Sequence, residues 1–256
     1  METQMTLHSS QGVQESWYEF PYHYVTSLSP NFSISRTYDW SLNYASAVQF
    51  LINQISINSE CASLVDIGCG DGRLTHELKK AHPTMKLAGI DYSERSISLA
   101  KALNHGNNIS FSALDLIDNP ISAEFDAAIL MEVYEHIEPS KASEFLKGVS
   151  AQLCKGGVLH LTVPHENIPC AKHHFRHFSS ELLTAELSEY FDVIEVKPFE
   201  RKSKKRRWLQ RILCNRLFVL NNAKLLNMVY EYYMRNLFHV EDESKCQRLY
   251  VMAKRK

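Results

Sequence analysis

Several features that would place this sequence in a common functional class are absent. The 28 basic and 29 acidic residues leave a formal net charge of −1, so no overall charge draws the chain to nucleic acid or to an anionic surface. No apolar run approaches the roughly 18 residues that a membrane-spanning helix requires. The six cysteines stand singly and form no C-x-x-C, which disfavours zinc and thioredoxin-type sites. Because the first residues lack the basic and apolar regions of a signal peptide, we expect a cytoplasmic protein.

Glycine is also scarce, yet three of the nine glycines stand at every second position within Leu64–Arg73. A hydrophobic run containing Asp66 precedes them, and Leu74 and Leu78 follow at helical spacing, so the segment predicts a strand, a tight turn and a helix. Glycine permits positive φ and close approach of a ligand to the backbone, and a helix N-terminus favours negative groups. The G-x-G-x-G spacing differs from that of dinucleotide sites, and the Lys-Ser/Thr of a P-loop is missing.

Two further carboxylates follow predicted strands. Asp91 ends the apolar run Met85–Ile90, and Asp115 follows Ile109–Leu114. An ionised aspartate only accepts hydrogen bonds, which suits the two hydroxyls of a ribose. Because the carboxyl ends of parallel strands meet at one edge of a sheet, we expect both acids to lie near the glycine turn. The remaining strands are expected at Phe125–Met131, Val158–Val163, Phe191–Pro198 and Arg248–Ala253.

In this order, the segments resemble the motifs of class I S-adenosylmethionine (SAM)-dependent methyltransferases. The resemblance covers about residues 44–198 and the final strand. It implies an α/β fold, with a Rossmann-like seven-stranded, mostly parallel sheet, helices on both faces and an antiparallel last strand. It also implies that Asp91 accepts from the ribose, that Asp115 accepts from the adenine amino group and that the N–H of Leu116 reaches a ring nitrogen. The expected cofactor contacts are Asp66, Gly68, Cys69, Gly70, Asp91, Tyr92, Asp115, Leu116 and Met131.

The chain divides into four expected segments. Residues 1–40 form an aromatic arm whose cluster Trp17–Tyr24 either covers the pocket or simply packs on the core. Residues 41–198 form the SAM-binding core and residues 246–256 its last strand. Between them, residues 199–245 form a basic, amphipathic helical insertion.

A candidate metal site follows the fourth expected strand. Glu132, Glu135 and His136 have the spacing i, i+3 and i+4, which places them on one face of a helical turn. Carboxylates and an imidazole can ligate Mg²⁺ or Mn²⁺. The pattern E-x-x-E-H resembles small-RNA 3′-end 2′-O-methyltransferases and ubiquinone-pathway O-methyltransferases, which implies metal binding. Many class I methyltransferases without a metal carry Glu-His at the floor of the cofactor pocket, so both alternatives stay open.

A second histidine cluster follows the fifth expected strand, where loops line the crevice of such a sheet. His173 precedes the motif H-x-x-H-F-S, which contains His174 and His177. This segment resembles one in small-molecule and glycan methyltransferases and implies that Ser179 caps the next helix. A histidine there can accept a proton from a hydroxyl near neutral pH, or can serve only as a surface or hydrogen-bonding residue. The candidate catalytic residues are His136, His165 and His177.

The insertion opens with the basic run Arg201–Trp208, and Leu209, Ile212 and Leu213 follow on one helical face. Such a segment is typical of contact with an anionic membrane or a phosphate backbone, or of a helical lid. Because the rest of the chain is not basic, we do not expect a nucleic-acid partner. Residues 201–220 are the candidate for peripheral contact with the inner face of a membrane.

Together, these patterns predict methyl transfer from SAM to a small-molecule, glycan or lipid-linked acceptor, with a hydroxyl as the acceptor group. Two alternatives remain at this point. One is a metal-assisted RNA 2′-O-methyltransferase, and the other is a SAM-binding regulatory protein without turnover.

Overall fold

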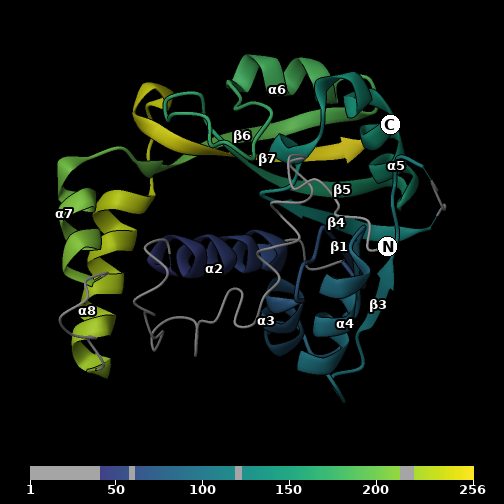
Figure 1. Cartoon of the computed structure of the whole chain (residues 1–256), viewed down its shortest axis with the longest axis horizontal. Helices are drawn as coiled ribbons and strands as arrows, with labels where there is room; N and C mark the ends of the chain where they lie inside the picture. The colour runs from purple at the N-terminus through teal and green to yellow at the C-terminus, as the bar shows by residue number, and fades with distance from the viewer. Residues whose placement is uncertain (1–40, 58–60, 119–122, 214–221) are drawn as a thin grey trace, which may run out of the picture.

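The computed structural model describes residues 41–57, 61–118, 123–213 and 222–256 (Figure 1). The aromatic arm predicted for residues 1–40 lies outside the described residues. One seven-stranded sheet has the order β3-β2-β1-β4-β5-β7-β6. The strands are β1 (Ser63–Ile67), β2 (Lys86–Asp91), β3 (Ser110–Ala113), β4 (Phe125–Met131), β5 (Leu153–Pro164), β6 (Phe191–Arg201) and β7 (Cys246–Arg255).

The strand directions confirm the predicted fold class. Strands β1 to β5 pair in parallel, and β7 lies between β5 and β6 and is antiparallel to both. Ile67 of β1 pairs with Ile90 of β2 and Leu130 of β4, so these strands end level with one another. Their carboxyl ends form a single edge, where such sheets bind ligands.

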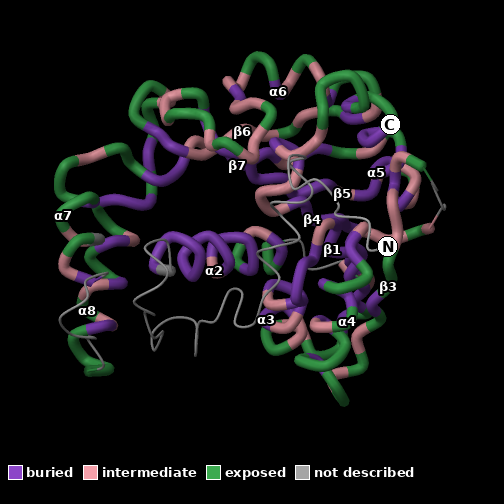
Figure 2. Tube along the Cα trace, in the orientation of Figure 1, coloured by how far each residue is buried: buried purple, intermediate pink, exposed green. Residues whose placement is uncertain are grey.

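Helices cover both faces of the sheet, as predicted. Helices α2 and α3 share a hydrophobic cluster with one face of β1, β2 and β4, and α5 and α6 pack on the other face. Figure 2 shows that the inner strands of the sheet and α2 are largely buried, whereas α7 and α8 present a largely exposed outer side. The helices are α2 (Ser41–Ile57), α3 (Arg73–Ala81), α4 (Glu94–Leu103), α5 (Ala142–Ala151), α6 (Ser180–Leu187), α7 (Lys204–Leu213) and α8 (Ala223–Tyr233), with short turns η1 (Tyr134–His136), η2 (Pro139–Lys141), η3 (Met234–Phe238) and η4 (Glu243–Lys245).

Three strands, β5, β6 and β7, are longer than the strand segments that the sequence predicted. β5 begins at Leu153 because the chain bulges rather than turns at Gly156, whose φ is +78°, and its register with β4 shifts between Phe125 and Ala127. β6 continues to Arg201, so the segment between the last two strands is 202–245. Among the described residues, no helix has the length and apolar character needed to cross a membrane.

Helices α7 and α8 stand to one side of the sheet, beyond one end of α2 (Figure 1). The hydroxyl of Tyr233 donates to Asn43 Oδ1 of α2 at 2.8 Å, which ties the two elements together. Leu213 is buried in the cluster of α2, and Leu209 packs against it. The leucine side of α7 thus faces the core, as the helical-lid alternative expects, whereas Trp208 is exposed and stands apart from it.

Candidate active site

The glycine turn after β1 requires glycine at each of its three positions. Gly68, Gly70 and Gly72 have φ values of +73°, +55° and +77°, in the left-handed region. A Cβ on Gly68 would lie 2.5 Å from a γ-carbon of Val133. The N–H groups of Gly68 and Cys69 both donate to the Ile90 carbonyl, at 2.7 and 3.0 Å. The turn is thus folded onto the end of β2 by the backbone itself.

The turn leads directly into the N-terminus of α3. Gly72 occupies the N-cap position and supplies no capping side chain. The N–H of Arg73 donates to Asp71 Oδ1 at 3.2 Å. The remaining N–H groups of the first turn and the positive end of the helix dipole favour a negative ligand group, such as the carboxylate of an amino-acid moiety.

Asp91 and Asp115 lie at the same edge as the turn, as the sequence predicted. Asp91 ends β2 and is buried, and its two oxygens accept from the N–H groups of Gly70 at 3.0 Å and Ser93 at 2.9 Å. A carboxylate oxygen can accept more than one hydrogen bond, so a hydroxyl can also donate to such a group. Asp115 is half-buried and accepts from the N–H of Ile117 at 2.8 Å. Both carboxylates are held by backbone donors.

The other predicted cofactor contacts surround these groups. Asp66 is buried inside β1, accepts from the Thr75 hydroxyl at 2.6 Å, and so anchors α3 beneath the turn. Burial raises the pKa of Asp66 to about 7, and the nearby charge of Asp91 adds to this. Burial likewise raises the pKa of the Cys69 thiol. Tyr92 follows β2, Leu116 is buried beside Asp115, and Met131 ends β4.

A second group of side chains lies beyond the end of β4. Glu135 and His136 of η1 and His174 of the loop after β5 each place one ligand atom within 4.8 Å of the others. The predicted helical face of Glu132, Glu135 and His136 is wrong, because Glu132 has a φ of +55° and precedes the turn. Glu132 instead accepts from Arg248 Nε at 2.8 Å.

Backbone carbonyls fix the tautomers of this histidine cluster. His136 Nδ1 lies 3.1 Å from the His173 carbonyl, which only accepts, so Nδ1 carries the proton and Nε2 a lone pair. His177 Nδ1 likewise donates to the Ile168 carbonyl at 3.1 Å, so its Nε2 accepts from His174 Nδ1 at 2.8 Å. His174 is thereby left with its lone pair on Nε2. Imidazoles oriented in this way are typical of metal ligands.

The electrostatics of the cluster also suit a cation. Glu135 is 1% exposed, and its Oε2, like Oε1 of Glu132, is buried without a hydrogen-bond partner. Burial raises the pKa of Glu135 well above its usual range, and the charge of Glu132 adds to this. Burial lowers the pKa of His136 to about 4 and of His174 to about 3, which keeps both imidazoles neutral. Neutral imidazoles and two carboxylates with unpartnered oxygens fit a divalent metal ion.

The structure separates the three predicted catalytic histidines. His165 has both nitrogens engaged, with Nε2 2.9 Å from Glu243 Oε1 and Nδ1 accepting from the Asn167 N–H at 2.9 Å. We therefore assign His165 to holding the end of β5 against η4. His177 orients His174. Of these three, His136 retains a ring nitrogen whose lone pair faces the carboxylate side of the cluster.

A buried ionic network, which the sequence analysis missed, joins this cluster to α7. Glu200 at the end of β6 pairs with both Arg206 and Arg248, and Arg248 also pairs with Glu132. Arg206 further donates to Gln247 Oε1 at 3.0 Å. The sequence pointed to this network only through the expected strand pairing. An antiparallel last strand places Arg248 opposite Pro164, at the end of β5.

Comparisons with known proteins agree with this geometry. Residues 64–157 match the family model described as a methyltransferase domain. The chain is 31% identical over 102 residues to a carboxy-S-adenosyl-L-methionine synthase of Campylobacter hominis, covering 39% of this chain and 43% of that protein. It spans about half or less of the length of the first such relatives that it matches.

Solved structures share the fold at low sequence identity. The cyclase SpnF has a TM-score of 0.61 at 15% identity, with 96% of each chain covered. The N-methyltransferase NodS of Bradyrhizobium japonicum, in complex with S-adenosyl-L-homocysteine, has a TM-score of 0.54 at 16% identity, covering 83% of this chain and 87% of that one. The chain thus contains a class I SAM-dependent methyltransferase domain. This follows from the matched domain, the sheet order and the glycine turn with its ordered acids.

Proposed function

We propose that this protein transfers the methyl group of SAM to a hydroxyl of a small-molecule, glycan or lipid-linked acceptor. The observation that carries the proposal is the group Glu135, His136 and His174 at the end of β4, next to the strand edge that holds the glycine turn. SAM supplies an activated methyl sulfonium, so the protein mainly has to align the acceptor with it.

The chain's own residues divide this work. The glycine turn, Asp91 and Asp115 hold the cofactor, and the acceptor hydroxyl lies against the histidine cluster. Nε2 of His136 can accept the hydroxyl proton, because its Nδ1 is committed to the His173 carbonyl. Since burial lowers the pKa of His136 to about 4, this nitrogen is a weak base at neutral pH.

We further propose that Glu135, His136 and His174 hold a divalent cation, with Glu132 beside them. Mixed carboxylate and imidazole ligands suit Mn²⁺ and, less closely, Mg²⁺. With such a cation bound, Nε2 of His136 would be a ligand rather than a base, and the cation would itself lower the pKa of the acceptor hydroxyl. It would favour acceptors with two neighbouring hydroxyls, among them the terminal ribose of an RNA, which is the second candidate function.

The test is turnover of radiolabelled SAM with a panel of hydroxylated small molecules, glycans, prenyl-linked phenols and short RNAs, with Mn²⁺, with Mg²⁺ and with chelator. Binding of SAM, measured separately by calorimetry, should weaken by roughly 2–4 kcal/mol in Asp91→Ala, because an ionised acceptor of two hydroxyls is lost. Asp118→Ala is a control, since Asp118 is exposed. Methylation of amines alone would exclude a hydroxyl acceptor, and SAM binding without turnover on any acceptor would favour a regulatory role.

A further inference from the structure

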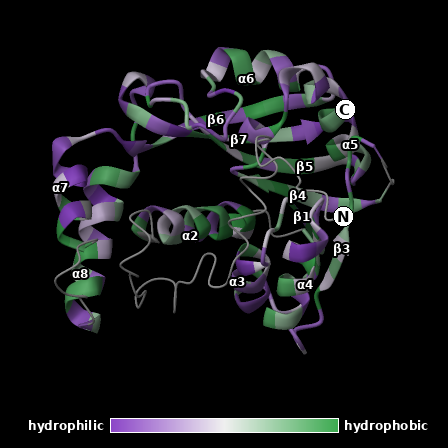
Figure 3. Cartoon of the chain, in the orientation of Figure 1, coloured by the Kyte–Doolittle hydropathy of each residue, from purple (hydrophilic) through white to green (hydrophobic). Residues whose placement is uncertain are grey.

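The outer side of α7 and α8 carries a basic and apolar surface that the methyltransferase site does not use. Its basic part is on α7, and its apolar part is Trp208 of α7 together with one stripe of α8. We call this surface the α7–α8 face, and it consists of Lys204, Lys205, Arg207, Trp208, Arg211, Leu225, Met228 and Tyr232. Figure 3 shows hydrophilic and hydrophobic residues alternating along both helices.

The basic residues of this face differ from the one arginine that lies among them. Arg206 points inward and is buried against Glu200 and Gln247. Lys204, Lys205 and Arg207 are exposed, and no carboxylate pairs with them among the described residues. Helix α7 contains no acidic residue. Its outer side is therefore a concentrated positive charge on a chain whose net charge is −1.

The apolar residues of the face are exposed to an unusual extent. Trp208 is 66% exposed and Met228 65% exposed, and Leu225 and Tyr232 continue the stripe of α8 at helical spacing. The opposite stripe of α8 is buried against the core. Helix α8 thus has two apolar sides, of which only one is covered within the described part of the chain.

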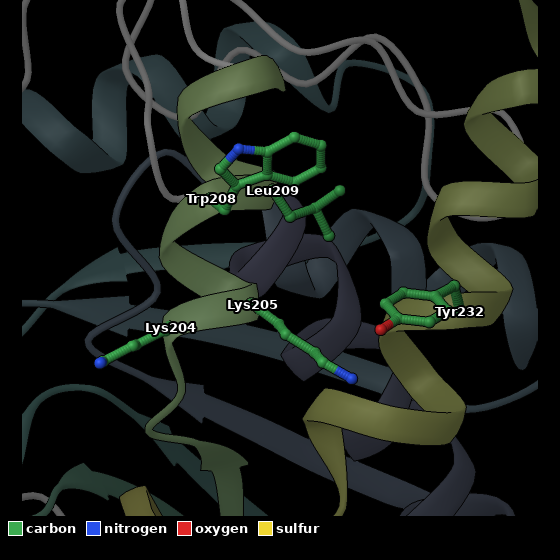
Figure 4. Close-up of a pocket in the computed structure, with 5 residues that line it drawn as sticks. All are labelled: Lys204, Lys205, Trp208, Leu209 and Tyr232. Carbon is green, nitrogen blue, oxygen red and sulfur yellow. The ribbon is translucent and has the colours of Figure 1, made fainter.

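The two helices also enclose a hollow of about 510 Å³. Its lining consists of Lys204, Lys205, Trp208, Leu209 and Tyr232. In Figure 4, Lys205 and Trp208 reach from α7 toward the side on which Tyr232 of α8 lies. The hollow combines apolar walls with the ammonium group of Lys205, which suits an anionic headgroup above its acyl chains.

We infer that the α7–α8 face docks on a membrane surface rich in anionic phospholipids. Charge complementarity selects this occupant, because lysine and arginine are attracted to anionic headgroups. Tryptophan and tyrosine favour the headgroup level, and lysine stems lie along apolar surface while their ammonium groups stay in water. Docking is independent of methyl transfer and does not rest on the proposed acceptor.

The α7–α8 face lies on the side of the sheet that carries the candidate active site, so docking would bring this site toward the membrane. The helices leave the sheet at Arg201 and return at Cys246, which are paired residues at the strand edge that carries the glycine turn and the histidine cluster. A bilayer on this face would lie on the same side of the sheet as the site. Lipid-linked acceptors would thereby be concentrated near it.

The experiment is co-sedimentation of the full chain with vesicles of phosphatidylcholine alone or mixed with phosphatidylglycerol. We expect binding only to the anionic vesicles at low salt, and release at high salt. The triple variant Lys204→Gln/Lys205→Gln/Arg207→Gln, which keeps Arg206, should bind about 100-fold more weakly, since three basic residues are removed. Trp208→Ala should weaken the low-salt binding several-fold, because the exposed indole is lost.

A matched control removes the same charge elsewhere. Lys101→Gln/Lys147→Gln/Lys155→Gln changes exposed lysines of α4, α5 and β5, away from α7 and α8 in Figure 1, and should bind like the wild type. SAM affinity and thermal midpoint confirm that each variant is folded. An equal loss in the control, no binding of the wild type to anionic vesicles, or binding of single-stranded RNA in their place would overturn the inference.

Discussion

The two halves of the candidate active site are built in different ways. The cofactor half takes the glycine turn, Asp91 and Asp115 from three neighbouring strands, and backbone N–H groups hold its carboxylates. The acceptor half takes its groups from segments as far apart as Glu132 and Arg248, and contacts between side chains add to the backbone carbonyls that orient its histidines. A site whose groups are held by backbone donors depends on the backbone conformation of a few residues. A site whose groups are held by other side chains depends on the position of each partner side chain.

The largest expected effect is a loss of stability on breaking the buried ionic network of the acceptor half. Glu200→Gln should lower the free energy of unfolding by about 3–5 kcal/mol, because it leaves buried arginine charge without its carboxylate. Glu195→Gln, on the same strand, breaks an exposed pair with Lys197 and should cost about 0–1 kcal/mol. Urea denaturation measures both. Equal losses would show that the buried network is no more important than a surface pair.

The next prediction concerns the pH dependence of stability that Asp66 of the cofactor half causes. The pKa of Asp66 is raised from 3.8 to about 7, so the folded state favours its protonated form, and stability present below about pH 4 is lost as the pH rises through about 7. A difference of this size corresponds to about 4 kcal/mol. Asp66→Asn keeps an acceptor for Thr75 and should remove this part of the pH dependence. Stability curves of wild type and variant that run parallel from pH 4 to 8 would refute the assignment.

A smaller effect tests the backbone conformation of the cofactor half. Gly68→Ala should weaken SAM binding about 100-fold in calorimetry, because its Cβ meets Val133 and a left-handed φ costs an L-residue about 1–2 kcal/mol. Gly106 has a φ of +85° with nothing within 4 Å of its added Cβ. Gly106→Ala therefore carries the strain without the contact, and should leave SAM affinity unchanged. Adding Val133→Ala to Gly68→Ala should recover part of the loss.

The smallest effect tests the metal ligands of the acceptor half. His174→Ala should weaken Mn²⁺ binding, followed by electron paramagnetic resonance, about 10–100-fold. His177→Ala should weaken it less, because it removes only the partner that fixes the His174 tautomer. His105→Ala, on an exposed turn, is the control. The ligand assignment fails if Mn²⁺ binds His174→Ala as tightly as the wild type.

The cofactor half could be predicted because its signals are local. Each hydrophobic run ends beside its acid, and the turn residues are contiguous. The N-cap of α6 was predicted in the same way, and Ser179 does accept from the Leu182 N–H, at 3.2 Å. Such features depend on residues a few positions apart, whose order in the sequence is also their order in space.

The acceptor half could not be predicted to the same depth. The left-handed φ of Glu132 goes with the packing of Val133 against Gly68, a contact between two strand ends. Arg206 belongs to a basic run whose sequence predicts exposure of every member. It is buried instead, because β6 brings Glu200 beneath it. His174 joins Glu135 only through the path of the loop after β5. Each depends on tertiary contacts that hydrophobic periodicity does not encode.

The pairing of Arg201 with Cys246 closes a long loop, residues 202–245, between the last two strands of the sheet. Because the cost of loop closure rises by only about 0.6 kcal/mol for each doubling of length, closing β6 on β7 across residues 202–245 costs about 2 kcal/mol more than a tight hairpin would. Packing of α7 and α8 on α2 offsets that entropy. The inserted helices leave and rejoin the sheet at paired residues, so a change in the length of this segment need not shift any strand. Such a change would leave the glycine turn, Asp91 and Asp115 in place, because they lie at the ends of strands β1 to β3, at the far side of the sheet order from β6 and β7.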